Sequence, residues 1–314
     1  MIEELENYID ENLINDENYH IIEFNNHETH FLGINNKKEI ALLINNENDL
    51  NLEIIPYKGS NLEIFYDKKC KIDKDQERKF TLLHLCTESK NVKKYFVQIS
   101  EILLNNLGSK PRLKNVEKEL ESVKEIFLNL KRKKIKDEIG LWGEVFFIYT
   151  QEDKNKAVSS WHLNSKDRID FNNGKRKVEI KTTLSSERKH VFKLKQLKSH
   201  YQENVLVCSI MTEEIENGLS IKDLVNLIFE ELDNNHKMKL IHKLSAVIEN
   251  DLETMKFRSF DEASASRSIK LFKSEEIPAF ELSEIPKEIS NIQFTSDLKN
   301  SSPFTELKIE KTLT

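Results

Sequence analysis

Residues 169–183 read IDFNNGKRKVEIKTT, and this stretch decides the fold. Asn173-Gly174 is a turn signal, because glycine readily adopts the positive φ that tight hairpin turns require. Asn-rich residues lead into the turn, and a run with alternating polar and apolar residues follows it. We therefore predict a β-hairpin between Trp161 and Lys181.

The return strand of this hairpin carries charged side chains on one face. Glu179 and Lys181 are two positions apart and point the same way, whereas Val178 and Ile180 face the other way and suit burial. A tight hairpin brings Asp170 near Glu179, although the register cannot be read from the sequence. Two neighbouring carboxylates repel unless a cation lies between them. Hard oxygen ligands with open water positions suit Mg²⁺.

An apolar helix is predicted around residues 140–149, GLWGEVFFIY, with Glu144 inside it. A charge in such surroundings needs a reason to be present. Glu144 could direct a third carboxylate at the same site. A metal held there polarises a phosphodiester and lowers the pKa of bound water. Lys181 could hold the attacking water and help to deprotonate it.

This order of motifs resembles the PD-(D/E)XK nuclease superfamily, also called restriction-endonuclease-like. In that superfamily a helix carrying Glu precedes a strand carrying Asp, then a strand carrying E-x-K, then a helix. The segments GLWGE, RIDF, VEIKTT, RKH with the following Gln196-Leu197, LSIKDLV and LFKSEEIPAFELSEIPKEISNIQFTSDL are similar to the bacterial group named "PD-(D/E)XK motif protein", over most of residues 140–298. Ile169 stands where the superfamily has proline.

The resemblance implies an α/β fold with a restriction-endonuclease-like mixed sheet flanked by helices. It implies a Mg²⁺-dependent DNA nuclease, with Mn²⁺ as a substitute, that leaves 5′-phosphate and 3′-hydroxyl ends and serves bacterial restriction-type defence against phages. Asp170 and Glu179 would bind the metal, assisted by Glu144 and the backbone carbonyl of Ile180. Gln196 would position the metal site or the DNA.

Charge is segregated along the chain, whose net charge is -6. Residues 1–107 carry 12 Lys+Arg and 20 Asp+Glu, residues 108–212 carry 23 and 14, and residues 213–314 carry 13 and 20. Clustered basic residues bind phosphate backbones. The predicted DNA contacts are Arg168, Lys175, Arg176, Lys177, Thr182, Arg188 and His190, with Lys189, Lys193, Lys195, Lys198 and the run 131–134 as further cations. No base-reading helix pattern is evident.

Each of these residues also has a purely structural interpretation. Glu179 and Lys181 could form a solvated strand face, and Asp170 could make a surface ion pair with Arg168 or Lys177. Glu144 could complement a helix dipole. His190 could serve only as a hydrogen-bonding residue, and Gln196 could be an ordinary helix residue. Thr182 could be present only because β-branched side chains suit a strand.

We predict three modules: a β-rich module over residues 1–107 closed by a helix, the nuclease core over 108–212, and an α+β module over 213–314. Gly108 is expected to cap the closing helix, and a charged helix is expected from Pro111 to about Lys136. Ser220 is expected to N-cap a helix over residues 220–232, and residues 269–282 are expected to form a strand. Three widely spaced cysteines support neither a disulfide framework nor a zinc ribbon. The acidic N-terminus is unlike a signal peptide, and we expect a cytoplasmic protein.

The chain lacks GxxxxGK[ST], so an ATPase function must come from a partner. We expect a helicase/ATPase or methyltransferase alongside DNA as partners. Two other functions stay open: a DNA-binding or scaffolding subunit with an idle or partner-activated core, which the acidic flanking modules favour, and an RNA nuclease.

Overall fold

The computed structural model describes residues 6–7, 19–24, 27–47, 55–59, 61–73, 76–129, 138–162, 169–197, 205–245, 258–281, 283, 285–286, 288–289 and 291–314. The chain divides into two compact units. Unit 1 comprises residues 1–134 and 240–255, and unit 2 comprises residues 135–239 and 256–314. The three predicted modules, over residues 1–107, 108–212 and 213–314, stay a prediction.

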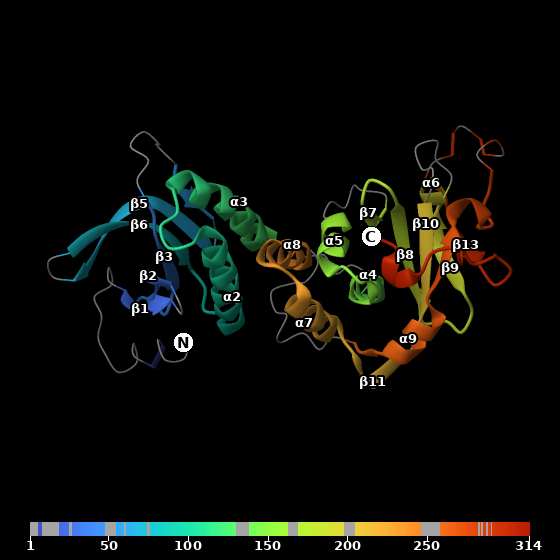
Figure 1. Ribbon diagram of the computed structural model, residues 1–314, viewed down its shortest axis with the longest axis horizontal. Coiled ribbons are helices and arrows are strands. Elements are labelled where there is room, and N and C mark those ends of the chain that lie inside the picture. The colour runs from blue at the N-terminus through green and yellow to red at the C-terminus, as the bar shows by residue number, and fades with distance from the viewer. Residues whose placement is uncertain are drawn as a thin grey trace. The chain divides into compact units, whose positions relative to one another are not determined.

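Unit 1 is built on a six-stranded antiparallel sheet in the order β1-β2-β3-β6-β5-β4 (Figure 1). Its central strand β3 is buried along almost its whole length, from Ile40 to Ile44. The bounds of the strands are β1 His20–Phe24, β2 His27–Ile34, β3 Ile40–Asn45, β4 Tyr57–Lys58, β5 Leu62–Asp73 and β6 Gln76–Leu85.

Two amphipathic helices complete unit 1, α2 (Lys90–Leu107) and α3 (Leu113–Asn129) (Figure 1). Ser89 accepts the N–H of Val92 and begins α2, and Gly108, at a φ of 71°, ends it. This bears out the predicted glycine cap, because positive φ at a helix end favours glycine. The predicted charged helix to about residue 136 is described as far as Asn129.

Unit 2 holds the predicted mixed sheet, in the order β12-β10-β8-β7. β8 pairs with β7 antiparallel and with β10 parallel, and β12 is antiparallel to β10. A second, two-stranded sheet pairs β9 with β13. The strands are β7 Phe171–Asn172, β8 Lys177–Thr183, β9 Lys189–Lys193, β10 Val205–Met211, β11 Glu214–Leu219, β12 Lys270–Lys273 and β13 Gln293–Asp297.

Helices flank this sheet, so the α/β fold class is confirmed. α4 packs on β8, and α9 packs on β10. The bounds are α4 Glu138–Thr150, α5 Lys154–Ser160, α6 Leu194–Leu197, α7 Ile221–Glu231, α8 Asn234–Ser245, α9 Glu262–Ser268, with short 3₁₀ turns at Ser274–Glu276 and Ile309–Lys311. The predicted N-cap of α7 is present as a reciprocal capping box between Ser220 and Asp223.

One predicted strand is shorter than its sequence pattern. The segment from Ile269 was expected to stay extended through Leu282, but β12 ends at Lys273 and a 3₁₀ turn follows. Pro278 lies soon after that turn and has no N–H to donate to a neighbouring strand. Ile277, beyond β12, instead packs in a hydrophobic cluster with Phe272 of β12 and Phe192 of β9.

Candidate active site

The hairpin of β7 and β8 places Asp170 beside the E-x-K strand. Phe171 pairs with Val178 in the antiparallel register, and Gly174 adopts a φ of 84° in the connecting turn. Asp170 Oδ2 accepts a 2.8 Å hydrogen bond from the backbone N–H of Ile180. The predicted hairpin and its positive-φ glycine are therefore confirmed, and the register missing from the sequence is now supplied.

Glu179 and Lys181 form an ion pair on one side of β8. The Glu179 side chain is nearly fully buried, and Lys181 Nζ lies 2.8 Å from Glu179 Oε1. The Lys181 amine also lies 5.4 Å from the centre of the Phe192 ring on β9, an attractive cation–π arrangement. A solvated strand face is thus the wrong interpretation for Glu179.

Glu144 reaches the same region from α4 because of the glycine before it. A Cβ on Gly143 would lie 1.7 Å from Thr182 Oγ1, so only glycine lets α4 approach β8 this closely. Trp161, which follows α5, donates its Nε1–H to Glu144 Oε2 at 2.6 Å. This bond holds the third carboxylate in place from outside the α4 helix.

The carboxylates of Glu144, Asp170 and Glu179 influence one another electrostatically. Burial raises the pKa of Asp170 well above its ordinary value, and the charges of Glu179 and Glu144 raise it further, against the Ile180 N–H and Lys181. Burial also raises the pKa of Glu179; Lys181 lowers it, and Glu144 raises it. A bound cation relieves such repulsion. The all-oxygen donor set fits Mg²⁺ or Mn²⁺.

The sequence from residue 9 to residue 299 matches the family described as "Putative PD-(D/E)XK family member (DUF4420)". The chain belongs to this family. The resemblance on which the superfamily was predicted is thereby confirmed, and with it the nuclease-like, restriction-endonuclease-like character of the protein. Enzymes of the PD-(D/E)XK class typically use divalent metals.

No match was found to a curated protein or to a solved structure. Within the described ranges, every helix is too short or too polar to span a bilayer.

In this PD-(D/E)XK family member, Arg188 and His190 are occupied by interior contacts. The Arg188 guanidinium donates to Ser209 O and Oγ and to Ser268 O, at 3.1, 2.7 and 2.6 Å. His190 Nε2 lies 2.7 Å from Ser209 Oγ. Burial, then Arg188 and Lys181, lowers the pKa of His190 to about 4. These contacts join β9, β10 and α9, which is the hydrogen-bonding role left open for His190; its predicted DNA contact is untested.

The three basic side chains near the hairpin turn differ in their exposure to solvent. Lys175 is exposed, and Lys177 is half-buried. The Arg176 guanidinium donates to the backbone carbonyls of Thr312 and Thr314, at 3.1 and 3.4 Å, and so ties the turn to the C-terminal residues. Of the three, Lys175 has the exposure that a phosphate contact needs.

Of three further residues predicted to belong to the site, the structure describes the side chain of only one. Thr182 packs its Oγ1 against Gly143, and within the described part of the chain this buried hydroxyl makes no hydrogen bond. Arg168 lies outside the described residues. Gln196 is in α6, but its side chain is outside the description. DNA contact by Thr182 and Arg168, and the positioning role of Gln196, stay predictions.

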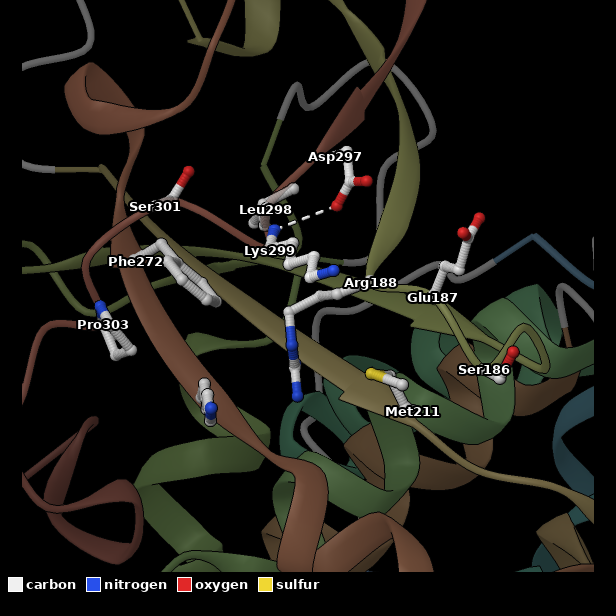
Figure 2. Close-up of a pocket in the computed structure, with 11 residues that line it drawn as sticks. Ser186, Glu187, Arg188, Met211, Phe272, Asp297, Leu298, Lys299, Ser301 and Pro303 are labelled. Carbon is white, nitrogen blue, oxygen red and sulfur yellow. Dashed lines mark hydrogen bonds between the residues drawn. The ribbon is translucent and has the colours of Figure 1, made fainter.

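A pocket of about 380 Å³ opens beside Arg188. Figure 2 shows Arg188 between Phe272 and Met211 in its lining. Cations and acids both line it, so its charge is mixed, and none of the three site carboxylates is among the lining residues. It is therefore separate from the carboxylate site.

Sequence reasoning missed two residues that shape the site. Trp161 orients Glu144, and Ser209 receives both Arg188 and His190. A serine inside the buried strand VLVCSIM was a usable signal, since a buried hydroxyl requires a partner. Trp161 had no comparable signal, because its partner is 17 positions away.

Proposed function

We propose that this protein is a metal-dependent deoxyribonuclease that hydrolyses phosphodiester bonds. The observation that carries the proposal is the cluster of Glu144, Asp170 and Glu179 with the Lys181 amine beside it. Three carboxylates held so close, with two pKa values raised, form a site whose charge a divalent cation balances. Family membership supports the nuclease class, and the substrate, the metal and the defence role are our proposals.

Asp170 and Glu179 would hold Mg²⁺ or Mn²⁺, with Glu144 and the Ile180 carbonyl assisting. When bound, the metal supplies Lewis-acid activation of the phosphate and of water. The Ile180 N–H fixes the Asp170 carboxylate for this task, and Trp161 fixes Glu144. Lys181, already bound to Glu179, holds its amine at the edge of the site, where it can hydrogen-bond and orient the attacking water.

The exposed Lys175 and Lys193 are the cations we propose for the phosphate track. Lys193 is close enough to Glu179 to lower the pKa of that carboxyl, and its side chain is exposed at the end of β9. Cleavage would leave 5′-phosphate and 3′-hydroxyl ends. We also propose a restriction-type defence context, with a partner that supplies ATP-driven or methylating activity.

The test uses the purified full chain with supercoiled plasmid, linear duplex DNA, single-stranded DNA and RNA, in Mg²⁺, Mn²⁺ or EDTA. We expect DNA cleavage in either metal and none in EDTA. Asp170→Asn and Lys181→Ala should remove cleavage, whereas Glu230→Gln, an exposed carboxylate on α7, should not. Full activity in Asp170→Asn or Lys181→Ala would overturn the proposal, and preference for RNA would reassign the substrate.

A DNA-binding or scaffolding subunit is the second candidate, favoured by the acidic charge of residues 1–107 and 213–314. Such acidic segments suit protein partners better than nucleic acid. DNA binding in EDTA, with no cleavage after Mg²⁺ or Mn²⁺ is added, would support this candidate over the nuclease.

A further inference from the structure

A second cluster of titratable side chains lies on or directly beside strands β3, β5 and β6 of unit 1; Figure 1 shows these strands as ribbons. His84 of β6 is the cross-strand neighbour of Glu63 on β5, and Cys86 follows it by two positions. Glu39 directly precedes β3, whose Ile40 pairs with Leu85. Because side chains alternate along a strand, these residues share one face of three adjacent strands.

The ligand-bearing atoms of this cluster lie within reach of one ion. His84 Nε2 is 3.2 Å from Glu39 Oε2, and His84 Nδ1 is 3.5 Å from Cys86 Sγ and 3.6 Å from Glu63 Oε2. One ligand atom each from Glu39, His84 and Cys86 all lie within 4.8 Å of one another. Bond lengths of about 2.0–2.3 Å around tetrahedral zinc imply ligand separations of about 3.3–3.8 Å. Glu39 and Cys86 lie at opposite ring nitrogens of His84, so their side chains would move closer together when one ion binds through a single ring nitrogen.

His84 differs from His30, a structural histidine of the same sheet. His30 Nε2 lies 2.9 Å from Gly108 O, and its Nδ1 accepts the N–H of Asn45 at 3.0 Å, so both ring nitrogens have hydrogen bonds. His84 Nε2 is buried and has no well-formed hydrogen bond among the described residues, although Glu39 is near. A buried ring nitrogen that faces a carboxylate without a well-formed hydrogen bond could bind a metal ion together with that carboxylate.

The charge balance of the cluster also favours a cation. Glu39, Glu63 and Cys86 can all become anions, and all are partly buried. A bound divalent ion would stabilise the thiolate and offset the carboxylate charges.

We propose that Glu39, His84 and Cys86 bind a zinc-type divalent ion, with Glu63 or water as the fourth ligand. Thiolate and imidazole select zinc and similar transition metals over Mg²⁺. Asn35 supports the site, because its Nδ2 donates to Glu39 Oε2 at 2.8 Å and orients the carboxylate. The ion would join β3 and β6 at one end of the sheet, independently of the nuclease function.

The test titrates Co²⁺, a spectroscopic substitute for zinc, into the chelator-treated full chain. A thiolate-to-Co²⁺ charge-transfer band reports a cysteine ligand, and the carboxylate site of unit 2 has none. We expect one equivalent of band-forming Co²⁺, displaced by Zn²⁺. Cys86→Ser should abolish the band, and Cys70→Ser, a half-buried cysteine of β5, should keep it.

Two further variants keep the test decisive if Cys86→Ser fails to fold. His84→Gln and Glu39→Gln should each weaken Co²⁺ binding at least about 10-fold, the lower range for disturbed metal ligation. Asp170→Asn should leave the band unchanged, which assigns it to unit 1. No thiolate band in the wild type, or an equal band in Cys86→Ser or His84→Gln, would overturn the proposal. Neither result would bear on DNA cleavage.

Discussion

The two units of this molecule assemble titratable groups in opposite ways. Unit 2 gathers carboxylates and an amine around one hairpin, so Asp170 and Glu179 are nine positions apart in sequence. In unit 1, a carboxylate that directly precedes β3 meets an imidazole and a thiol at the end of β6, so Glu39 and His84 are brought together by long-range pairing. Hard oxygen donors suit Mg²⁺, whereas sulfur and nitrogen suit zinc. Local assembly leaves a sequence signature, and long-range assembly does not.

The largest expected effect separates the two clusters by mutation. Asp170→Asn keeps an oxygen for the Ile180 N–H but removes the charge, and DNA cleavage should fall by roughly 10³-fold or more, since a metal contributes several kcal/mol. Cys86→Ser should leave cleavage unchanged when folded. Initial rates on plasmid DNA with saturating Mg²⁺ measure both. Comparable losses of cleavage in the two variants would contradict the view that the two clusters act independently.

The same substitution should stabilise the metal-free fold. Because the folded pKa of Asp170 is raised above the unfolded value of about 4, the folded state holds its proton more tightly. This contribution is present at low pH and is lost as pH rises through the folded pKa. In EDTA at neutral pH, Asp170→Asn should therefore melt at a higher temperature than the wild type. A lower melting temperature at every pH would contradict this account.

A smaller effect is expected where α4 meets β8. Gly143→Ala places a Cβ against Thr182 and should cost about 1–3 kcal/mol of unfolding free energy, the usual range for overpacking. Cleavage should also fall, because the substitution moves Glu144 away from Asp170. The double variant Gly143→Ala/Thr182→Ala removes the clashing hydroxyl and should recover part of the stability.

Urea unfolding of the four members of this cycle measures the coupling. Additive effects of the two substitutions would show that the contact between Gly143 and Thr182 does not set the helix position.

Trp161→Phe tests how the third carboxylate is held. Phenylalanine preserves an aromatic ring beside Phe171 but cannot donate to Glu144. Loss of such an orienting bond typically costs about 10- to 100-fold in metal affinity or activity. We expect a higher Mg²⁺ concentration for half-maximal cleavage, at a melting temperature close to that of the wild type. Unchanged Mg²⁺ dependence would show that Trp161 only packs.

The sequence predicted the hairpin geometry of unit 2 because its constraints are local. The turn at Gly174, the shared face of Glu179 and Lys181, and the nearness of Asp170 all follow from strand and hairpin geometry. The burial of Glu179 was not predictable, because it depends on β9, which packs on that face from a separate sheet. Trp161 was missed for the same reason, since its bond to Glu144 is a tertiary contact.

Arg188 shows what a count of charges leaves out, and its predicted DNA contact stays a prediction. In sequence it belonged to the basic residues of a phosphate track, yet its guanidinium bonds to Ser209 and Ser268 within the fold. Composition reports how many cations a segment has but not which ones face solvent. Similarly, three widely spaced cysteines predicted no zinc ribbon, and nothing in their spacing indicated that β3 would bring Glu39 to His84 and Cys86.

The smallest effect at neutral pH is expected at His190, and it separates an interior role from DNA contact. Its folded pKa of about 4 lies below the unfolded value of about 6.5, so the folded state keeps the ring neutral. This contribution to stability is present above pH 6.5 and is lost as pH falls towards 4, by up to about 3 kcal/mol. His190→Gln can still bond Ser209 but does not titrate.

The unfolding free energy of the wild type should therefore fall relative to that of His190→Gln as the pH falls from 7 to 4, because only the wild type has a ring that must stay neutral in the folded state. Burial lowers this pKa most, followed by the charges of Arg188 and Lys181, so the pH-dependent change between wild type and His190→Gln should be smaller in an Arg188→Gln background. Parallel pH profiles for wild type and His190→Gln would contradict the interior role. A large loss of duplex DNA affinity at pH 7.5, with stability intact, would instead establish His190 as a DNA contact.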